Sequence, residues 1–423
     1  MQNQKEMVRG IGFLALVASC FNCTVGGGIF RLPNSIFEIA GRASPLIYVV
    51  CFSVMLLVAG VFIQVGRTIR VSGGPYAYVK PVLGEYFGFI CGVLLWTLAT
   101  FAFASVSNAY AHFVALFFPT LMSPVFEAGI LGVSLIGLSI FNSRGVKSGA
   151  RVSLALALFK ILPLLFLLVI GLPHLDAGAM ALPEHFDTGA MARAAMILIF
   201  AFTGVESALI PSGEIDNPER TLPRALVFSS VMVLVLYVGV HSVSQSVLGA
   251  GLAEKGISPL ALAAEKLVGP MGGTLLGLGA VVSTLGYLSA MTLSLPRSLF
   301  AFAEDGYLPK FLATLSPTTH APTRAIWVQV GIVYLLAVSA QFERLAVISN
   351  LAAILMYILC AVAAIILIKR QGKMSFLSIA IPVGAILTMG FLLTSVSSLE
   401  WAGVLGLVAL ASVFFGIKRF LMK

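Results

Sequence analysis

Charged residues are scarce in this sequence: Asp, Glu, Lys and Arg together make up only 10% of its 423 residues. Hydrophobic residues account for 59%, and the mean hydropathy is +1.03. A water-soluble protein of this composition could not hide its apolar surface, so we expect the lipid bilayer to be its solvent. The composition therefore excludes an ordinary soluble fold.

Cysteine is also rare, and the chain lacks a polar stretch long enough for a second domain. All five cysteines fall within apolar segments, which argues against an extracellular disulfide framework. The first apolar segment has no small-residue cleavage site, so we do not expect a signal peptide. The sequence predicts a single transmembrane domain over residues 1–423, without a linker or a low-complexity tract.

Long apolar segments recur along the whole chain, and a transmembrane helix needs about 20 such residues. We identify twelve, near residues 11–33, 45–66, 84–118, 125–142, 152–172, 190–211, 225–250, 271–303, 325–340, 345–368, 375–397 and 400–421. The ninth is short for a span. The sequence therefore predicts an all-α integral membrane protein with twelve transmembrane helices.

The formal net charge of +9 is distributed unevenly over this pattern. If the N-terminus is cytoplasmic, 19 of the 26 lysines and arginines fall on the inner side and 6 on the outer side, while Lys160 lies within a span. This asymmetry satisfies the positive-inside rule and supports an even helix count with both termini in the cytoplasm. We interpret the basic balance as topology in the cell membrane and expect no nucleic-acid partner.

Two segments carry helix-breaking residues at matching positions. Gly26 precedes Pro33 by seven residues in the first segment, and Gly204 precedes Pro211 by seven in the sixth. Matched interruptions in two halves of a membrane protein are typical of inverted repeats around a binding site at the membrane midplane. The alternative is that these residues only allow close packing or a kink.

A helix broken within a bilayer exposes backbone groups that must find polar partners. At Gly26, Gly27 and Gly28 no side chain covers the backbone, so freed N–H groups and the positive end of the next half-helix can bind a carboxylate. The carbonyl groups near Cys23–Thr24 and Phe200–Thr203 can accept hydrogen bonds from an ammonium group. Together, the two breaks predict a site for the zwitterionic headgroup of an α-amino acid.

Four sequence stretches strengthen this interpretation. They are VGGGIFRLP in the first segment, SGGPYAYVKPVLGEYFGFICG after the second, FAFTGVESALIPSGEIDNPERTLPRA in and after the sixth, and AFAEDGYLPKFLATL after the eighth. In this order they resemble the signatures of the amino acid–polyamine–organocation transporters over the whole chain. The resemblance implies secondary transport of amino acids. It also implies a five-plus-five inverted repeat (about 10–172 and about 190–368) with helices 1 and 6 discontinuous, followed by two extra helices (about 374–421).

The resemblance places the substrate on the two broken helices and their neighbours. The residues that we expect to contact it are Thr24, Gly26, Gly27, Gly28, Ile29, Ala99, Phe103, Phe200, Ala201, Thr203, Gly204 and Met291. Gly27 stands where relatives often have serine, so the backbone must suffice there. Arginine/agmatine exchangers of the superfamily have tryptophan where Phe200 stands and asparagine near Phe103. These apolar replacements favour a neutral amino acid, and a cationic amino acid or polyamine exchanger is the alternative.

Lys160 is a cation within the fifth segment. A lysine in the middle of a span costs about 2.5–3.5 kcal/mol on insertion scales, so it needs a partner or a function. Desolvation could let it exchange protons near neutral pH. In sodium-independent relatives a lysine on the fifth helix takes the place of a sodium ion. We therefore predict sodium-independent transport coupled through Lys160. The alternative is a side chain that extends to the inner surface.

Several further residues are candidates for coupling or gating. Glu206 follows the sixth-helix break and could titrate or hold the inner end of the substrate path, or it could be a neutral hydrogen-bonded carboxyl. The gate candidates are Trp96, Phe202 and Tyr357, although aromatic residues more often serve packing. His112 and His241 are expected to be satisfied histidines of the helix bundle or of the membrane interface. We expect no cofactor and no metal site.

The sequence thus predicts a secondary transporter that moves a small-molecule amino acid by alternating access, as a proton symporter or as an exchanger. A polytopic membrane enzyme or a channel is the alternative from another class. An enzyme would need convergent acidic or histidine residues, yet only Glu206 and Lys160 lie deep in a span. A channel would need a repeated filter element. An oligomer is compatible with the sequence, which does not determine its size.

Overall fold

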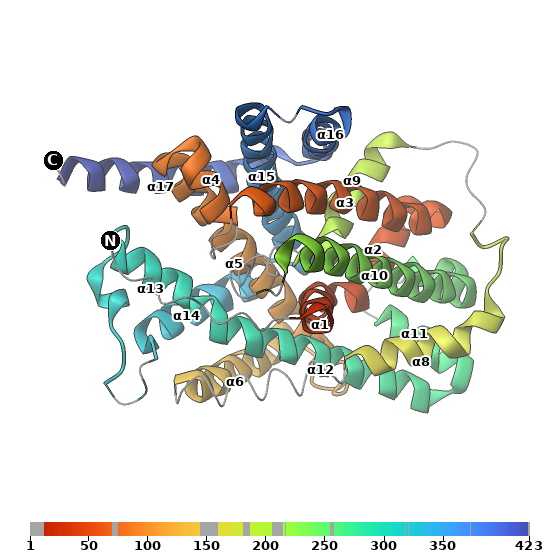
Figure 1. Ribbon diagram of the computed structural model, residues 1–423. Helices are drawn as coiled ribbons and strands as arrows, with labels where there is room; N and C mark the ends of the chain where they lie inside the picture. The colour runs from red at the N-terminus through yellow and green to blue at the C-terminus, as the bar shows by residue number, and fades with distance from the viewer. Residues whose placement is uncertain are drawn as a thin grey trace.

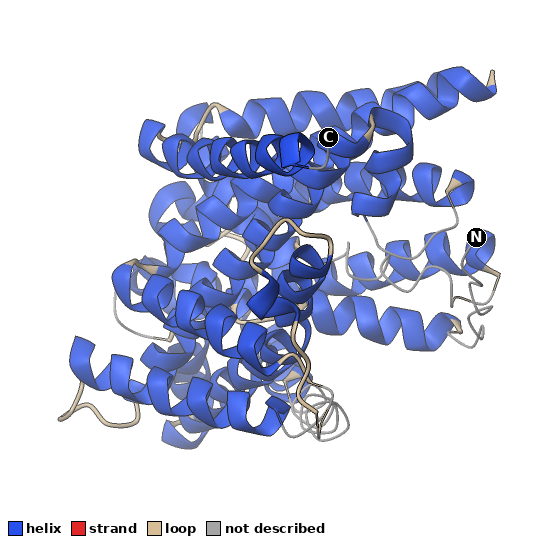
Figure 2. Ribbon diagram, turned by 90° about the vertical axis from the view of Figure 1, so that its left-hand side faces the viewer, coloured by secondary structure: helices blue, strands red, loops and turns tan. Residues whose placement is uncertain are grey.

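The computed structural model describes residues 12–69, 75–143, 160–180, 187–204, 215, 217–253, 258–317, 319, 321–372 and 374–421. These residues form helices joined by short loops, and no β-strand occurs among them, as Figure 2 shows. The α-helices are α1 (Phe13–Thr24), α2 (Gly28–Ala40), α3 (Ser44–Thr68), α4 (Pro75–Leu83), α5 (Glu85–Ala115), α6 (Pro124–Ser143), α8 (Ile161–Gly171), α9 (Thr188–Leu198), α10 (Pro218–Leu248), α11 (Pro259–Val268), α12 (Pro270–Ser294), α13 (Pro296–Glu304), α14 (Thr323–Ser339), α15 (Phe342–Gln371), α16 (Phe376–Leu393) and α17 (Ser398–Leu421). The short 3₁₀ helices are η1 (Gly41–Ala43), η2 (Leu172–His174), η3 (Ile199–Phe202), η6 (Gly249–Ala253) and η7 (Lys310–Ala313).

Eight helical stretches of the described residues are long and apolar enough to cross a membrane. Three more apolar helices, Ile161–His174, Thr188–Phe202 and Thr323–Ser339, are shorter. The chain is therefore an all-helical, multi-pass membrane protein. The count of twelve spans and the inverted repeat stay predictions.

The centre of the molecule is built on α5 and α15, which pack against each other. Serine hydroxyls bond across this interface, as is common between membrane helices. Ser349 Oγ donates to the Leu98 carbonyl at 2.9 Å, and Ser105 Oγ donates to the Phe342 carbonyl at 2.9 Å. These bonds fix α15 against α5 beside the helix breaks described below.

The remaining helices surround this pair. Figure 1 shows α3 and α10 running side by side across the molecule, in agreement with their contacts. The two halves of the first apolar segment have different partners, since α1 packs on α10 while α2 packs on α9. At the periphery, α16 and α17 expose large apolar side chains such as Leu387, Phe391 and Phe414, as expected for helices that face lipid.

Candidate substrate site at two helix breaks

The first apolar segment is interrupted where the glycine triplet predicts it. Helix α1 ends at Thr24, Val25 takes an extended conformation, and α2 begins only at Gly28. The Val25 amide still donates to the Phe21 carbonyl at 2.9 Å, so Val25 closes the last turn of α1. Beyond it, Gly26 and Gly27 lie outside both helices. Of the first amides of α2, that of Phe30 donates to the Gly27 carbonyl at 3.2 Å, and those of Gly28 and Ile29 precede any acceptor in their own helix.

The glycines at this break also allow neighbouring helices to approach the backbone. A Cβ atom on Gly27 would lie 2.8 Å from Thr284 Cγ2 on α12 and 3.2 Å from Val106 Cγ1 on α5. A Cβ atom on Gly26 would meet only ordinary contact, at 3.9 Å from Tyr287 Cδ2. Gly27 is therefore the position at which a serine would collide with its surroundings.

A second interruption follows α9. The α-helix ends at Leu198, the chain tightens into η3, and Gly204 has a φ of +114°, which disfavours residues with a side chain. The Thr203 amide donates to the Ile199 carbonyl at 3.1 Å, and Thr203 Oγ1 donates to the Phe200 carbonyl at 2.8 Å. Residues 205–214, including Glu206, lie outside the described residues.

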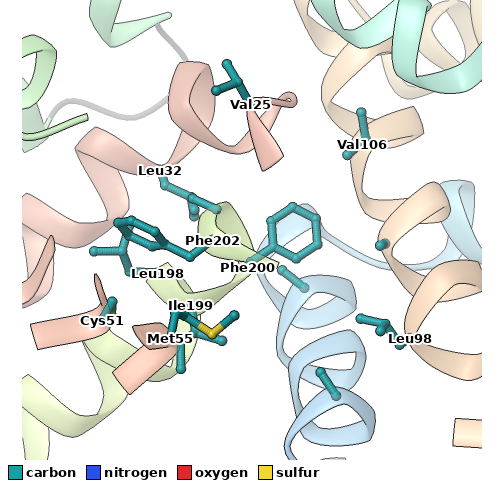
Figure 3. Close-up of a cluster of buried hydrophobic side chains, with 14 of the residues drawn as sticks. Val25, Leu32, Cys51, Met55, Leu98, Val106, Leu198, Ile199, Phe200 and Phe202 are labelled. Carbon is teal, nitrogen blue, oxygen red and sulfur yellow. The ribbon is translucent and has the colours of Figure 1, made fainter. Parts of the chain in front are cut away.

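The two interruptions touch each other. A Cβ atom on Gly28 would lie 3.4 Å from Ala201 Cα and 3.4 Å from Phe200 Cδ1, so the start of α2 rests directly on η3. Figure 3 shows Phe200 and Phe202 pointing to opposite sides of η3. The Phe200 ring meets Phe342 of α15 at 5.5 Å between centroids, and the Phe202 ring meets Tyr237 of α10 at 5.4 Å.

The backbone at the first break combines donors and acceptors. The first amides of α2 have no acceptor within their own helix and carry its positive dipole end, which suits an anion. At the other side, the Thr24 carbonyl ends α1 and accepts a hydrogen bond of 3.1 Å from Tyr237 Oη. Thr24 Oγ1 bonds back to the Cys20 carbonyl at 2.9 Å. The amides that begin α2 and the carbonyl that ends α1 can thus bind the negative and the positive group of a zwitterion.

The predicted side-chain pocket lies on helices that face the break. Ala99 and Phe103 share a face of α5 with Val106 at helical spacing, and Met291 lies one turn beyond Tyr287 on α12. Phe103 is fully buried, whereas Ala99 and Met291 are partly exposed. Ile29 is also fully buried, so its backbone is the part available to a ligand.

Four residues beside the breaks were missed by sequence reasoning. Thr284 and Tyr287 face the glycines from α12, and Tyr237 bonds the end of α1. Asn350 of α15 donates to the Met196 carbonyl at 2.6 Å, close to where α9 gives way to η3. Of these four, Asn350 carried a sequence signal, as an amide near the start of the apolar segment 345–368.

The candidates for coupling and gating lie in different surroundings. Lys160 is 6% exposed and directly precedes α8. Trp96 Nε1 donates to Gln329 Oε1 at 2.9 Å, which ties α5 to α14. Tyr357 is buried, with its ring 5.8 Å from that of Phe62. Phe202 belongs to η3 itself, so it is the gate candidate in contact with a break.

A cavity of about 890 Å³ opens at one end of the helix bundle and reaches toward the second break. We call it the vestibule; its polar lining includes Arg31, Asn34, Ser35, Asn108, Glu127 and Glu343. Arg31 Nε lies 3.5 Å from Glu343 Oε1, and Ser35 Oγ donates to the same oxygen at 3.0 Å. Two buried lining residues, Ile197 and Phe342, adjoin η3.

Comparison with known proteins extends over the whole chain. A family model described as "Amino acid permease" matches residues 11–417. The serine/threonine exchanger SteT of Bacillus subtilis (strain 168) is 27% identical, and the match covers 97% of each chain. The branched-chain amino acid permease BcaP of the same organism is 24% identical over 95% of this chain and 90% of the relative. Its methylthioribose transporter is 23% identical over 93% and 89%.

Proposed function

This chain belongs to the amino acid permease family, a family of transporters rather than enzymes, and we propose that it is a secondary active transporter for neutral amino acids of small to medium size. The substrate binds at the two helix breaks and crosses the cytoplasmic membrane by alternating access. Both termini are on the cytoplasmic side, and the vestibule is the outer entrance.

The observation that carries this proposal is the contact between the breaks. Gly28 of α2 rests on Phe200 and Ala201 of η3, so the first amides of α2 and the end of η3 meet in one place. Discontinuous helices that meet in this way supply donors for a carboxylate and acceptors for an ammonium group. The substrate headgroup contacts are accordingly Thr24, Gly26, Gly27, Gly28, Ile29, Ala201, Thr203 and Gly204.

A neutral side chain suits the surroundings of the breaks. Phe200, Phe103 and Met291 are apolar, and the described residues that face the glycines, Val106, Thr284 and Tyr287, carry no charge. Relatives named for serine/threonine and for branched-chain amino acids support the same class. Glu206 favours the second candidate, a cationic amino acid or polyamine exchanger, because its carboxylate could hold a second positive charge.

The coupling we propose is independent of sodium. Lys160 is a buried cation ahead of α8, and it acts either by exchanging a proton or as a fixed charge that makes the protein an obligatory exchanger. Exchange and proton symport are both compatible with this role.

A binding screen followed by transport tests the proposal. The purified protein is heated with each of the twenty amino acids, agmatine and putrescine, and a ligand at a hundred times its Kd should add about 2.7 kcal/mol of apparent stability. We expect stabilisation by small neutral amino acids and exchange of the same compounds in proteoliposomes. Stabilisation by arginine, agmatine or putrescine alone would favour the second candidate. If none of these compounds showed either exchange or proton-driven uptake, transport of this class would be contradicted.

A further inference from the structure

The side chain of His241 is a polar group that the proposed transport site does not use. It lies on α10 and is fully buried, and its ring nitrogens make no hydrogen bond to another helix in the part of the chain that the structure describes; its polar neighbour is Gln245, one turn along the same helix. His112 differs, because its Nδ1 lies 3.1 Å from Glu127 Oε1. A buried imidazole without a partner costs about 1–3 kcal/mol, so its retention needs a reason.

Two unused hydrogen-bond acceptors flank His241. The Tyr48 ring of α3 lies 4.8 Å from the imidazole ring, and Tyr48 Oη has no hydrogen-bond partner among the described residues. Gln245 follows His241 by one helical turn on α10. Its Nε2 donates to the Ala179 carbonyl at 2.8 Å and to the Arg42 carbonyl at 3.3 Å, which leaves Oε1 as its unpaired atom in the described structure.

This pairing of groups suits a protonated imidazole. A neutral imidazole has one donor and one acceptor, whereas an imidazolium has two donors and no acceptor. Because the Gln245 amide nitrogen is held by two carbonyls, its oxygen is the atom free to accept. A phenol oxygen and an amide oxygen can thus accept both N–H groups of a charged His241. The charge itself lacks a carboxylate in contact with it among the described residues, so burying it stays costly.

His241 is also linked to both helix breaks. Tyr237 precedes it by one turn on α10 and donates its hydroxyl to the Thr24 carbonyl at the end of α1. Phe202 of η3 meets the Tyr237 ring at 5.4 Å and the Tyr48 ring at 6.4 Å. At its other end, Gln245 bonds the connections that carry Arg42 and Ala179, which are expected on the outer side. A buried polar row therefore runs from that side to the substrate site.

We propose that His241 is a proton-binding site of the transport cycle, loaded from the Gln245 end when the outer side is open. This inference rests on the proposed transport function and adds to it a site at which outer protons slow the cycle, while the coupling role proposed for Lys160 is unchanged. In the packed arrangement described here the imidazole is neutral, since closing the cluster around a charged ring is disfavoured. Outer acidity therefore holds the outer side open and slows the closing step.

Other titratable groups lie on the elements packed around α10. They are Cys20 on α1, Arg31 and Glu38 on α2, Tyr48 and Cys51 on α3, Lys160 ahead of α8, His174 in η2, and Glu265 and Lys266 on α11, together with Glu219, Arg220, Arg224 and Tyr237 on α10 itself. Tyr48 is the member of this group with a described ring contact to His241. Among these groups, histidine is the type whose ordinary pKa of about 6.5 lies in the physiological range.

The test is amino acid exchange in proteoliposomes with the internal pH clamped at about 7.5 and the external pH varied between about 5 and 8, a range that brackets histidine titration. Labelled L-serine and, in parallel, labelled L-leucine are the probes. In the wild-type protein we expect exchange to fall as the external pH falls, by at most tenfold per pH unit for one titrating group. His241→Gln, which cannot titrate, should keep the high-pH rate and lose the pH dependence, whereas the matched control His112→Gln should keep it.

A second variant keeps the test decisive if His241→Gln does not fold. Tyr48→Phe removes one proposed acceptor and should move the midpoint to lower pH by about half to one unit. Two outcomes contradict the proton-binding role of His241 and leave the transport function intact. One is wild-type exchange that does not depend on external pH, and the other is a pH dependence of exchange that is unchanged in His241→Gln or Tyr48→Phe. If His112→Gln loses the pH dependence, the proton binds at His112, beside the vestibule residue Glu127, and the proposed role of His241 is also overturned. Absence of both exchange and proton-driven uptake at every pH contradicts the proposed transport function itself.

Discussion

Arg31 and Glu343 join two helices across the mouth of the vestibule, with Arg31 Nε 3.5 Å from Glu343 Oε1. Arg31 belongs to α2, the half-helix that begins at the first break. Glu343 lies in the first turn of α15, which packs on α5 at the centre of the molecule. Any movement of α2 away from α15 must separate this pair. The pair is therefore placed to hold the outer side closed.

Removing this ion pair should make the vestibule open more readily. Glu343→Gln eliminates the charge attraction. A partly exposed ion pair contributes about 0.2–1 kcal/mol, which changes the equilibrium between the closed and the open vestibule by a factor of up to about five. We expect a cysteine at the buried position Ala111, which lines the vestibule, to react up to about fivefold faster with an impermeant thiol reagent in Glu343→Gln than in Ala111→Cys alone. Equal labelling rates would mean that the pair does not restrain opening.

A methyl group at Gly27 should disable the site. In Gly27→Ala the new Cβ would lie 2.8 Å from Thr284 Cγ2, and overpacking of this kind typically costs about 1–3 kcal/mol, or roughly 5- to 150-fold in binding. Exchange measured in proteoliposomes should fall accordingly, whereas Gly129→Ala on α6, with nothing within 4 Å, should have no effect.

A compensating change separates this collision from general damage. Thr284→Ser removes the Cγ2 methyl group, so the double variant Gly27→Ala, Thr284→Ser should recover part of the lost exchange. If the double variant is no more active than Gly27→Ala, the close approach of α12 is not the cause of the loss.

The hydroxyl of Tyr237 should contribute to substrate binding through Thr24. Tyr237→Phe removes the donor to the Thr24 carbonyl at the end of α1, and a hydrogen bond of this kind contributes about 0.5–1.5 kcal/mol. We expect the apparent KM for exchange to rise by up to about tenfold. Tyr110→Phe is the control, because its hydroxyl pairs with Ser134 Oγ between α5 and α6. Identical kinetics in both variants would exclude this role of Tyr237.

Transport should not require sodium. Replacing sodium by choline at fixed pH on both sides should leave the exchange rate unchanged, because we propose that Lys160 supplies the positive charge that a sodium ion would otherwise provide. Lys160→Ala should lose transport while retaining its melting temperature in detergent. Sodium-stimulated uptake under a clamped proton gradient would overturn this prediction.

The sequence alone was sufficient to predict that the protein lies in a lipid bilayer, that it is helical and that its first apolar helix is interrupted. Apolar composition requires a bilayer wherever the chain folds, and Gly26 and Gly27 interrupt a helix through local backbone preference. The end of α9 before Gly204 follows from the same kind of signal. The contacts of the predicted substrate residues with a substrate, and the roles of Lys160 and Glu206, stay predictions.

Only the tertiary structure decided which groups meet at the breaks. Thr24 and Tyr237 are 213 residues apart in sequence, and Asn350 is 154 residues from Met196. Among apolar membrane helices, hydrophobic periodicity does not specify the partner of each face, because every face is compatible with lipid or with another helix. The contact between Gly28 and η3, and the burial of His241 beside Tyr48, therefore depend on how the helices pack. Backbone preference located the interruption in the first helix, and packing brought the two interruptions together.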